Sequence, residues 1–108
     1  MKNINRLEIT ATLKHKGTLV CLENGDKAIN VNIGLPFGKR YCRFDCTAYG
    51  AVAEGLAEAG EGAGLFITGA LYQDRTTDKQ GKTVYWSKIR INSFKIMEEA
   101  VSDDAAPF

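Results

Sequence analysis

The sequence is poor in the residues from which metal centres and acid–base catalysts are built. It has one His, three Cys and one Trp among 108 residues. No Ser/His/Asp or Cys/His arrangement in a recognisable context accompanies the single His, and no two carboxylates share a predicted face. The sequence therefore supports no catalytic site. We expect a protein that is not an enzyme and that needs no cofactor.

The three cysteines suit neither a disulfide framework nor a metal centre. Their odd number argues against disulfide pairing. Cys42 and Cys46 have a spacing that resembles a metal pair, but along a strand they would lie about 13 Å apart at ~3.3 Å per residue. One tetrahedral zinc ion cannot bind both thiolates over that distance. We predict no metal site and interpret Cys21, Cys42 and Cys46 as small buried hydrophobic residues.

Long apolar runs are also missing. None approaches the roughly 20 residues that a membrane-spanning helix needs. The first residues, Met-Lys-Asn-Ile-Asn-Arg-Leu-Glu, contain no apolar segment of a signal peptide. We expect a cytoplasmic protein without membrane contact. Because 44% of the 108 residues are hydrophobic, the sequence predicts one domain around a small core.

Net charge is small, at +1, but the charges are unevenly distributed. Residues 98–108 contain four of the 13 acidic residues and none of the 14 Lys and Arg. Residues 1–97 therefore hold 14 basic against 13 − 4 = 9 acidic side chains, a surplus of +5. We expect a mildly basic domain over residues 1–97 and a short, flexible, acidic tail over residues 98–108.

Alternating apolar and polar side chains dominate the first 97 residues. Leu7, Ile9, Ala11 and Leu13, for example, alternate with polar residues, which is the pattern of a half-buried strand. The sequence predicts strands over residues 7–14, 18–23, 28–35, 40–50, 65–72 and 82–97, with hairpin turns at 24–26 and 74–81.

Residues 51–60 are the one predicted helix. Val52 and Leu56 are i, i+4 neighbours on its apolar side, and the glycines of residues 60–64 end it. Those glycines lack the Gly-Lys-Ser/Thr of a phosphate-binding loop. One helix among about five antiparallel strands predicts an all-β domain, a small five-stranded barrel that is closed or partly closed.

The stretch over residues 40–50 separates into two unlike rows at a period of two. One row is apolar, and the other contains Tyr41, Arg43, Asp45 and Thr47. A ring beside a guanidinium suits an unpaired polynucleotide, because rings stack on bases and cations bind phosphates. Asp45 is the one carboxylate of this row, and we expect it to pair with Arg43 or with a Lys across the sheet.

Other segments extend this aromatic and basic surface. In the last strand, Tyr85 and the other odd positions are predicted to face the core, and the even positions to face outward. Phe66 is more typical of a buried interface or of packing under the helix. The candidate strand-binding residues are Lys14, Lys16, Tyr41, Arg43, Tyr49, Tyr72, Arg75, Lys82, Trp86, Lys88 and Arg90.

The acidic tail ends in a short linear motif. Asp103 and Asp104 precede Pro107 and Phe108. A basic pocket on a partner could bind the acids and the terminal carboxylate, with the ring in an apolar slot. The alternative interpretation is an ordinary frayed terminus.

These motifs together resemble the bacterial single-stranded DNA-binding proteins, a family with the oligonucleotide-binding (OB) barrel. The resemblance rests on Phe-Asp-Cys-Thr-Ala-Tyr-Gly at 44–50, Ala-Glu at 53–54, Leu-Phe-Ile-Thr-Gly-Ala-Leu at 65–71, Asp-Lys-Gln-Gly-Lys at 78–82 and Asn-Arg-Leu at 5–7. The acids followed by Pro-Phe match the end of that family as well.

The resemblance implies sequence-independent binding of single-stranded DNA in replication, recombination and repair. It also implies a homo-oligomer, dimer or tetramer, associated with the nucleoid, whose tail recruits replication and repair proteins. Tyr49 matches a stacking ring of the family. Arg43 stands where the family usually has Trp, and the second Trp that the family often has near Thr76 is also missing, so Trp86 would be a relocated ring. The family's long linker before the tip is absent.

Two other functions fit the same pattern. A primosome-type barrel, similar to primosomal replication protein N, binds DNA and bridges replication proteins, although that family lacks the acidic Pro-Phe end. A barrel of this kind could also serve only as a protein-interaction or structural module. RNA in place of DNA stays open.

Overall fold

The structure is a computed structural model that describes residues 3–98. Its elements in chain order are β1 (Leu7–Lys16), β2 (Val20–Cys21), β3 (Lys27–Phe37), β4 (Arg40–Tyr49), α1 (Gly50–Glu58), β5 (Gly64–Thr77) and β6 (Thr83–Glu98). The predicted fold class, mostly β with one helix, is confirmed.

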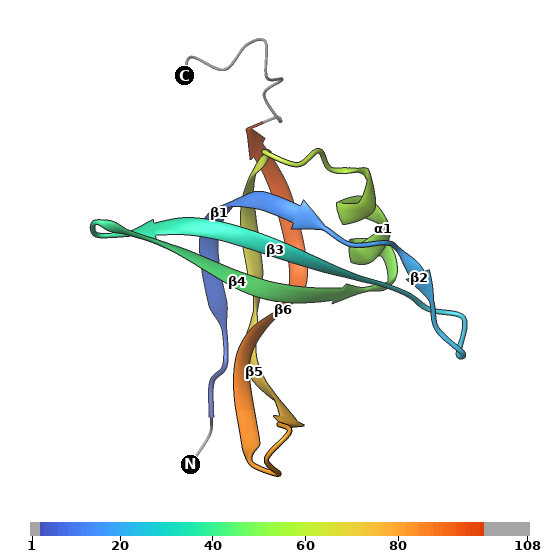
Figure 1. The fold of residues 1–108 in the computed structure, drawn as a ribbon. Coiled ribbons are helices and arrows are strands. Elements are labelled where there is room, and N and C mark those ends of the chain that lie inside the picture. The colour runs from blue at the N-terminus through green and yellow to red at the C-terminus, as the bar shows by residue number, and fades with distance from the viewer. Residues whose placement is uncertain (1–2, 99–108) are drawn as a thin grey trace.

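Five of the strands form a closed barrel (Figure 1). The sheet order is β1-β5-β6-β4-β3-β2, and an additional pairing between β1 and β3 closes it. β1 reaches both neighbours because residues 7–12 pair with β5 and residues 12–16 pair with β3. A register shift between Leu13 and His15 bends the strand there. The predicted five-stranded barrel is therefore confirmed.

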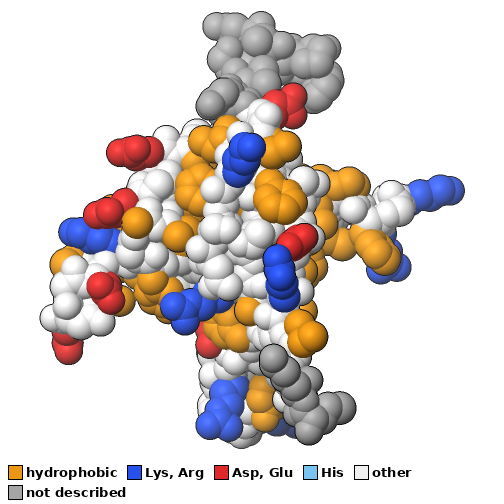
Figure 2. Space-filling view, turned by 180° about the vertical axis from the view of Figure 1, so that it is seen from behind, with side chains coloured by type: hydrophobic (Ala, Val, Ile, Leu, Met, Phe, Trp, Pro, Cys, Tyr) orange, Lys and Arg blue, Asp and Glu red, His pale blue; other side chains and the backbone are white. Residues whose placement is uncertain are grey.

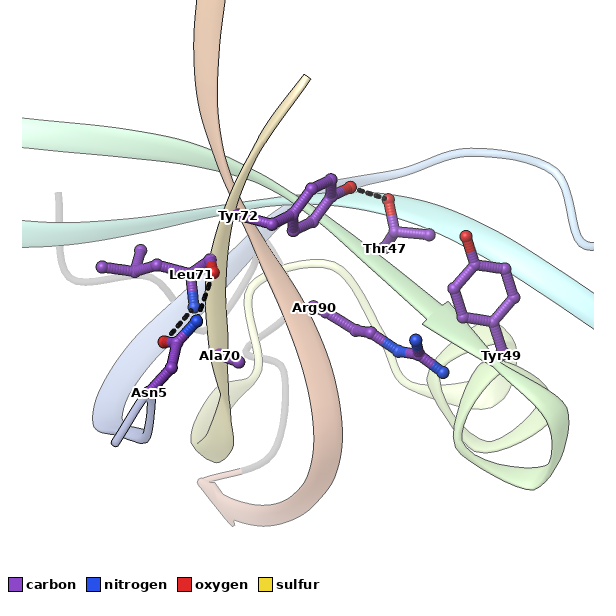
Figure 3. Close-up of a pocket in the computed structure, with 7 residues that line it drawn as sticks. All are labelled: Asn5, Thr47, Tyr49, Ala70, Leu71, Tyr72 and Arg90. Carbon is purple, nitrogen blue, oxygen red and sulfur yellow. Dashed lines mark hydrogen bonds between the residues drawn. The ribbon is translucent and has the colours of Figure 1, made fainter. Parts of the chain in front are cut away.

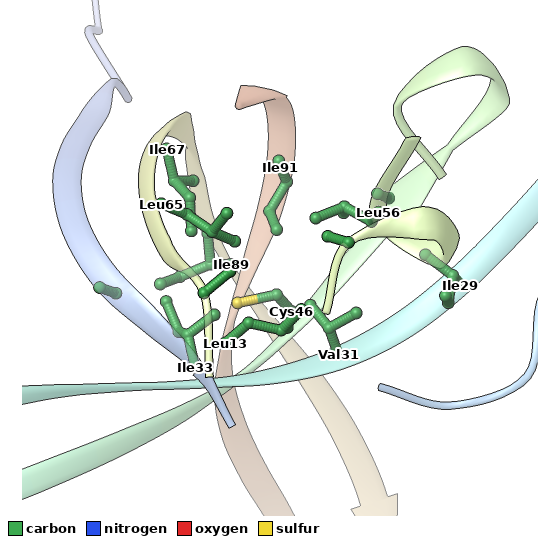
Figure 4. Packing of buried hydrophobic residues seen from close by; sticks show 14 of the residues in the cluster. Leu13, Ile29, Val31, Ile33, Cys46, Leu56, Leu65, Ile67, Ile89 and Ile91 are labelled. Atoms are coloured by element: carbon green, nitrogen blue, oxygen red, sulfur yellow. The ribbon is translucent and has the colours of Figure 1, made fainter. Parts of the chain in front are cut away.

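The core consists of the apolar rows that the alternation predicted. Leu13 and Ile33 are fully buried, Cys46 is 1% exposed, and Figure 4 shows these side chains packed together inside the barrel. The helix α1 packs against β3, β4 and β6. It contributes Ala53 and Leu56, both fully buried, to the same core.

The β3–β4 and β5–β6 hairpins project from the barrel in Figure 1. The β3–β4 arm comprises residues 35–42, and the β5–β6 arm comprises residues 73–87. The turn predicted over residues 74–81 is too long, because β5 continues to Thr77 and β6 begins at Thr83. Its polar side chains are compatible with a strand because this part of the ribbon has no core to face.

Two predicted core residues lie elsewhere. Tyr85 is 58% exposed, because it belongs to the β5–β6 arm and not to the barrel wall. Cys21 is exposed, because β2 is a two-residue strand at the edge of the sheet. The predicted tail residues Asp103, Asp104, Pro107 and Phe108 lie outside the described residues, and the tail stays a prediction.

Candidate nucleic-acid interface

The outward side chains of β5, β6 and β4 form one continuous surface. Thr47 of β4 is paired with Arg90 of β6, and Arg90 is paired with Ala70 of β5. Further along the same ribbon, Tyr72 faces Lys88 and Asp74 faces Trp86. We call this surface the β5–β6–β4 face. Its members are Thr47, Tyr49, Tyr72, Asp74, Trp86, Lys88 and Arg90.

The first pocket of this face surrounds Tyr49 and Arg90 (Figure 3). The Arg90 guanidinium lies 4.8 Å from the centroid of the Tyr49 ring, a cation–π distance. The ring is 41% exposed, so its stacking surface is in part open to a ligand. The pocket has a volume of about 400 Å³ and is lined by Asn5, Thr47, Tyr49, Ala70, Leu71, Tyr72 and Arg90.

Local backbone geometry exposes Tyr49. This residue ends β4 in an extended conformation, with φ −131° and ψ 156°. Gly50, which follows it, has φ +65°, a left-handed value that favours glycine. The chain therefore turns sharply into α1 and leaves the Tyr49 ring at the rim of the barrel.

Hydrogen bonds fix the other side of the first pocket. The Thr47 hydroxyl donates to Asn30 Oδ1 at 3.0 Å, so the Tyr72 hydroxyl, 3.1 Å away, acts as donor to Thr47. The Asn5 amide donates to the Leu71 carbonyl at 2.7 Å and accepts from the Leu71 N–H at 3.0 Å. These contacts give the pocket a defined shape before any ligand binds.

The second pocket surrounds Trp86. The indole Nε1 donates to Thr76 Oγ1 at 3.1 Å, which orients a ring that is 54% exposed. Lys88 forms an ion pair of 2.9 Å with Asp74, and the hydrogen bond from Lys88 to that carboxylate raises the Lys88 pKa. The pocket measures about 430 Å³ and is lined by Asp45, Asp74, Arg75, Thr76, Trp86 and Lys88.

A third aromatic and basic group lies on the β3–β4 arm. The Lys14 ammonium is 4.8 Å from the Tyr41 ring centroid. The ring covers Gly34, where a Cβ atom would meet it. Arg43 is exposed beside them. Tyr41 and Tyr49 are eight residues apart on one strand, about 26 Å at ~3.3 Å per residue, so this group lies apart from the first pocket.

Basic side chains also mark the outer ends of both arms. Figure 2 shows Lys and Arg in blue at the end of the arm that extends to the right and of the arm that points down. Lys39 and Arg40 belong to the β3–β4 arm, and Lys79 and Lys82 to the β5–β6 turn. The Lys82 N–H donates to Asp78 Oδ1 at 2.8 Å, which shapes that turn.

The structure does not bring every predicted residue to this surface. Lys16 lies at the end of α1, where its ammonium donates to the carbonyls of Ala57 and Ala59, each at 2.6 Å. A cation there complements the helix dipole and its unpaired carbonyls. Within residues 3–98, Asp45 forms no ion pair with Arg43 or with a Lys; its Oδ1 accepts from the Asn32 amide at 3.1 Å, and its charge contributes to the raised pKa of Lys88.

Sequence reasoning missed several residues that shape the two pockets. Thr76 and Asp74 hold Trp86 and Lys88, and Asn5 and Asn30 organise the first pocket. Their partners are 10 to 66 residues away in the chain. Such pairings depend on strand register, which single-residue patterns do not show.

In residues 3–98 no group of three His, Cys, Asp or Glu could hold a metal ion. Burial raises the pKa of Cys46 to about 12, so its thiol is inert at neutral pH. Over the same residues no helix is long and apolar enough to cross a membrane.

The closed five-stranded barrel with one helix between β4 and β5 defines an OB fold. Its aromatic and basic outer face is compatible with the surfaces on which this fold binds oligonucleotides. The fold therefore places this chain in the class of OB-fold proteins.

Solved structures agree with that assignment. Two structures of the PriB protein of Ralstonia solanacearum have TM-scores of 0.65 and 0.67 at 20% and 19% identity. The alignments cover 87% and 89% of this chain and 99% and 100% of theirs. The SSB domain of a Synechococcus sp. protein has a TM-score of 0.67 at 13% identity, covering 87% of this chain and 97% of its own. These identities show a shared fold. No protein-family model and no curated protein matches the sequence.

Proposed function

We propose that this protein binds single-stranded DNA through contacts that tolerate any sequence. The observation that carries the proposal is the β5–β6–β4 face, on which Tyr49, Trp86 and Arg90 lie within one continuous surface. Stacking of a base on an aromatic ring contributes about 1–3 kcal/mol, and each phosphate contact adds a salt-dependent term. The likeness to PriB and SSB-domain structures supports the same function.

A titration with single-stranded DNA tests this proposal. Trp86 is the only Trp, so its fluorescence reports on the second pocket alone. Oligo-dT of increasing length should quench it, and the affinity should fall as salt rises. The absence of both quenching and binding at low salt would remove the proposal. Oligo-rU of matched length, titrated in parallel, distinguishes DNA from RNA.

The proposed cellular role is in DNA replication, recombination and repair, in the cytoplasm and on the nucleoid. We propose that Asp103, Asp104, Pro107 and Phe108 recruit replication and repair proteins. This part rests on the acidic Pro-Phe pattern of the sequence. Deletion of residues 103–108 should abolish capture of partner proteins and leave DNA binding intact. Equal capture by the shortened chain would contradict it.

A primosome-type assembly protein is the second candidate function. The two PriB structures favour it through their higher identity, 19–20% against 13% for the SSB domain, at similar coverage of this chain. Such a protein would bridge DNA and replication proteins through its barrel. It should therefore keep its protein partners after deletion of residues 103–108, which distinguishes the two candidates.

We further propose that two copies of the chain associate. An apolar groove of about 310 Å³ lies beside the β3–β4 arm. Phe37, at its rim, is 75% exposed, so one surface offers both a hollow and a projecting ring, which suits a two-fold contact. Replacement of Phe37 by Ser should shift the molar mass in light scattering toward the monomer. An unchanged mass would exclude this surface. The groove is lined by Leu7, Ile9, Leu35, Phe37, Cys42, Phe44, Leu71 and Ile89.

A further inference from the structure

The pocket around Trp86 differs from the first pocket in its charges. Asp45 and Asp74 offset Arg75 and Lys88, so the four formal charges of its lining cancel. The lining of the first pocket includes Arg90 and no carboxylate. A phosphate is attracted by uncompensated cations and repelled by carboxylates. The Trp86 pocket is therefore a poor phosphate site, although its aromatic ring is open.

The two carboxylates retain free acceptor capacity. One Asp74 oxygen pairs with Lys88 at 2.9 Å, and Asp45 Oδ1 accepts from the Asn32 amide at 3.1 Å. Within residues 3–98 no side-chain hydrogen bond or ion pair engages the second oxygen of either group. An ionised carboxylate can only accept hydrogen bonds. The pocket thus combines a stacking ring with two acceptors that a donor group could fill.

Nucleobases differ in what they present to such acceptors. Cytosine carries an N4 amino donor and adenine an N6 amino donor, whereas thymine presents a carbonyl oxygen at the corresponding position. In single strands these edges are free of a pairing partner and open to protein side chains. A carboxylate accepts from the amino group of cytosine, and it is repelled by the O4 of thymine.

We propose that the pocket formed by Asp45, Asp74 and Trp86 receives a nucleobase that carries an exocyclic amino group. It thereby adds a preference for cytosine over thymine to contacts that otherwise tolerate any sequence. The ring provides the stacking surface, Thr76 fixes its orientation at 3.1 Å, and the carboxylates accept from the amino group. This inference rests on the proposed binding of single-stranded DNA.

The test compares oligo-dC with oligo-dT of equal length in competition against a labelled strand. The wild-type protein should bind oligo-dC about three- to tenfold more tightly, as expected for one additional net hydrogen bond. An oligonucleotide of N4,N4-dimethylcytosine keeps the ring and loses both amino hydrogens, so it should bind like oligo-dT.

Variants then assign the preference to the pocket. Asp74→Leu and Asp45→Leu each remove a negative charge and the acceptor oxygens. Loss of the charge should strengthen binding to every strand, so the readout is the dC/dT affinity ratio, from which that effect cancels. Each ratio should fall toward one. Glu54→Leu is the matched control, because Glu54 is an exposed carboxylate on α1, and its ratio should equal that of the wild type.

Each outcome has one meaning. Measurable binding with equal affinities for oligo-dC and oligo-dT overturns the base preference and leaves the proposed function standing. A dC/dT ratio that survives in both Asp variants overturns the assignment to this pocket. Failure to bind either strand at low salt refutes the proposed function, and the base preference with it.

Discussion

Replacement of Trp86 by Ala tests the proposed surface most directly, because a neighbouring ring provides a matched control. Trp86 is 54% exposed and lies on the β5–β6–β4 face. Tyr85 is 58% exposed and is adjacent on the same strand. Successive side chains of a strand point to opposite faces, so the two rings share the β5–β6 arm but not the same side of it.

The expected effect follows from stacking. Loss of one base–aromatic contact of about 1–3 kcal/mol weakens binding roughly 5- to 150-fold. The Tyr85→Ala variant should bind within about twofold of the wild type, since its ring lies on the side of the arm opposite to the β5–β6–β4 face. Both variants should stay folded, because neither ring belongs to the buried core.

Fluorescence anisotropy of a labelled strand measures both affinities, since the Trp86→Ala variant has no Trp whose fluorescence could report binding. Circular dichroism before and after heating checks that the variants fold. Equal losses for the two variants would mean that the arm as a whole, and not its Trp86 side, carries binding. No loss for Trp86→Ala would refute the stacking argument.

Four further predictions each concern a single residue. Leu56→Ala should lower the free energy of unfolding in urea by about 2–5 kcal/mol, because Leu56 is fully buried. Lys16→Met should lower the free energy of unfolding by about 1 kcal/mol, because it removes the contacts of Lys16 with α1. Arg90→Met should instead make the slope of log DNA affinity against log salt shallower, by the contribution of about one phosphate contact. Burial raises the pKa of the Cys46 thiol to about 12 in the folded state, above its ordinary value of 9.0, which applies when the chain is unfolded. Its contribution to stability should therefore decline between those two pH values in alkaline urea titrations, and a flat profile would contradict this.

The sequence predicted the barrel well because apolar alternation is a direct record of which side of a strand is buried. Leu13, Ile33 and Ile89 were recognisable in this way, and all are buried. The same rule failed at Tyr85. There β6 has left the barrel and forms a two-stranded ribbon with β5. Because both faces of this ribbon are exposed to water, apolar and polar side chains need not alternate along it.

The candidate site was only partly predictable. The outward rows of the strands indicated Tyr49, Trp86 and Arg90, and the structure places them on one face. The partners of these residues were not predictable. Asp74 binds Lys88 across the β5–β6 register, and Lys16 meets carbonyls more than 40 residues away.

By itself, the sequence determined the number and type of the elements, since the periodicity of apolar side chains and the turn residues are local properties. Only the tertiary structure decided which outward side chains meet. The pairings of β6 with β4 and with β5 set the registers that bring the pocket residues together, and closure of β1 onto both β5 and β3 completes the barrel. The same closure commits Lys16 to the helix, because a long, flexible cation binds whichever unpaired carbonyls the fold places within its reach.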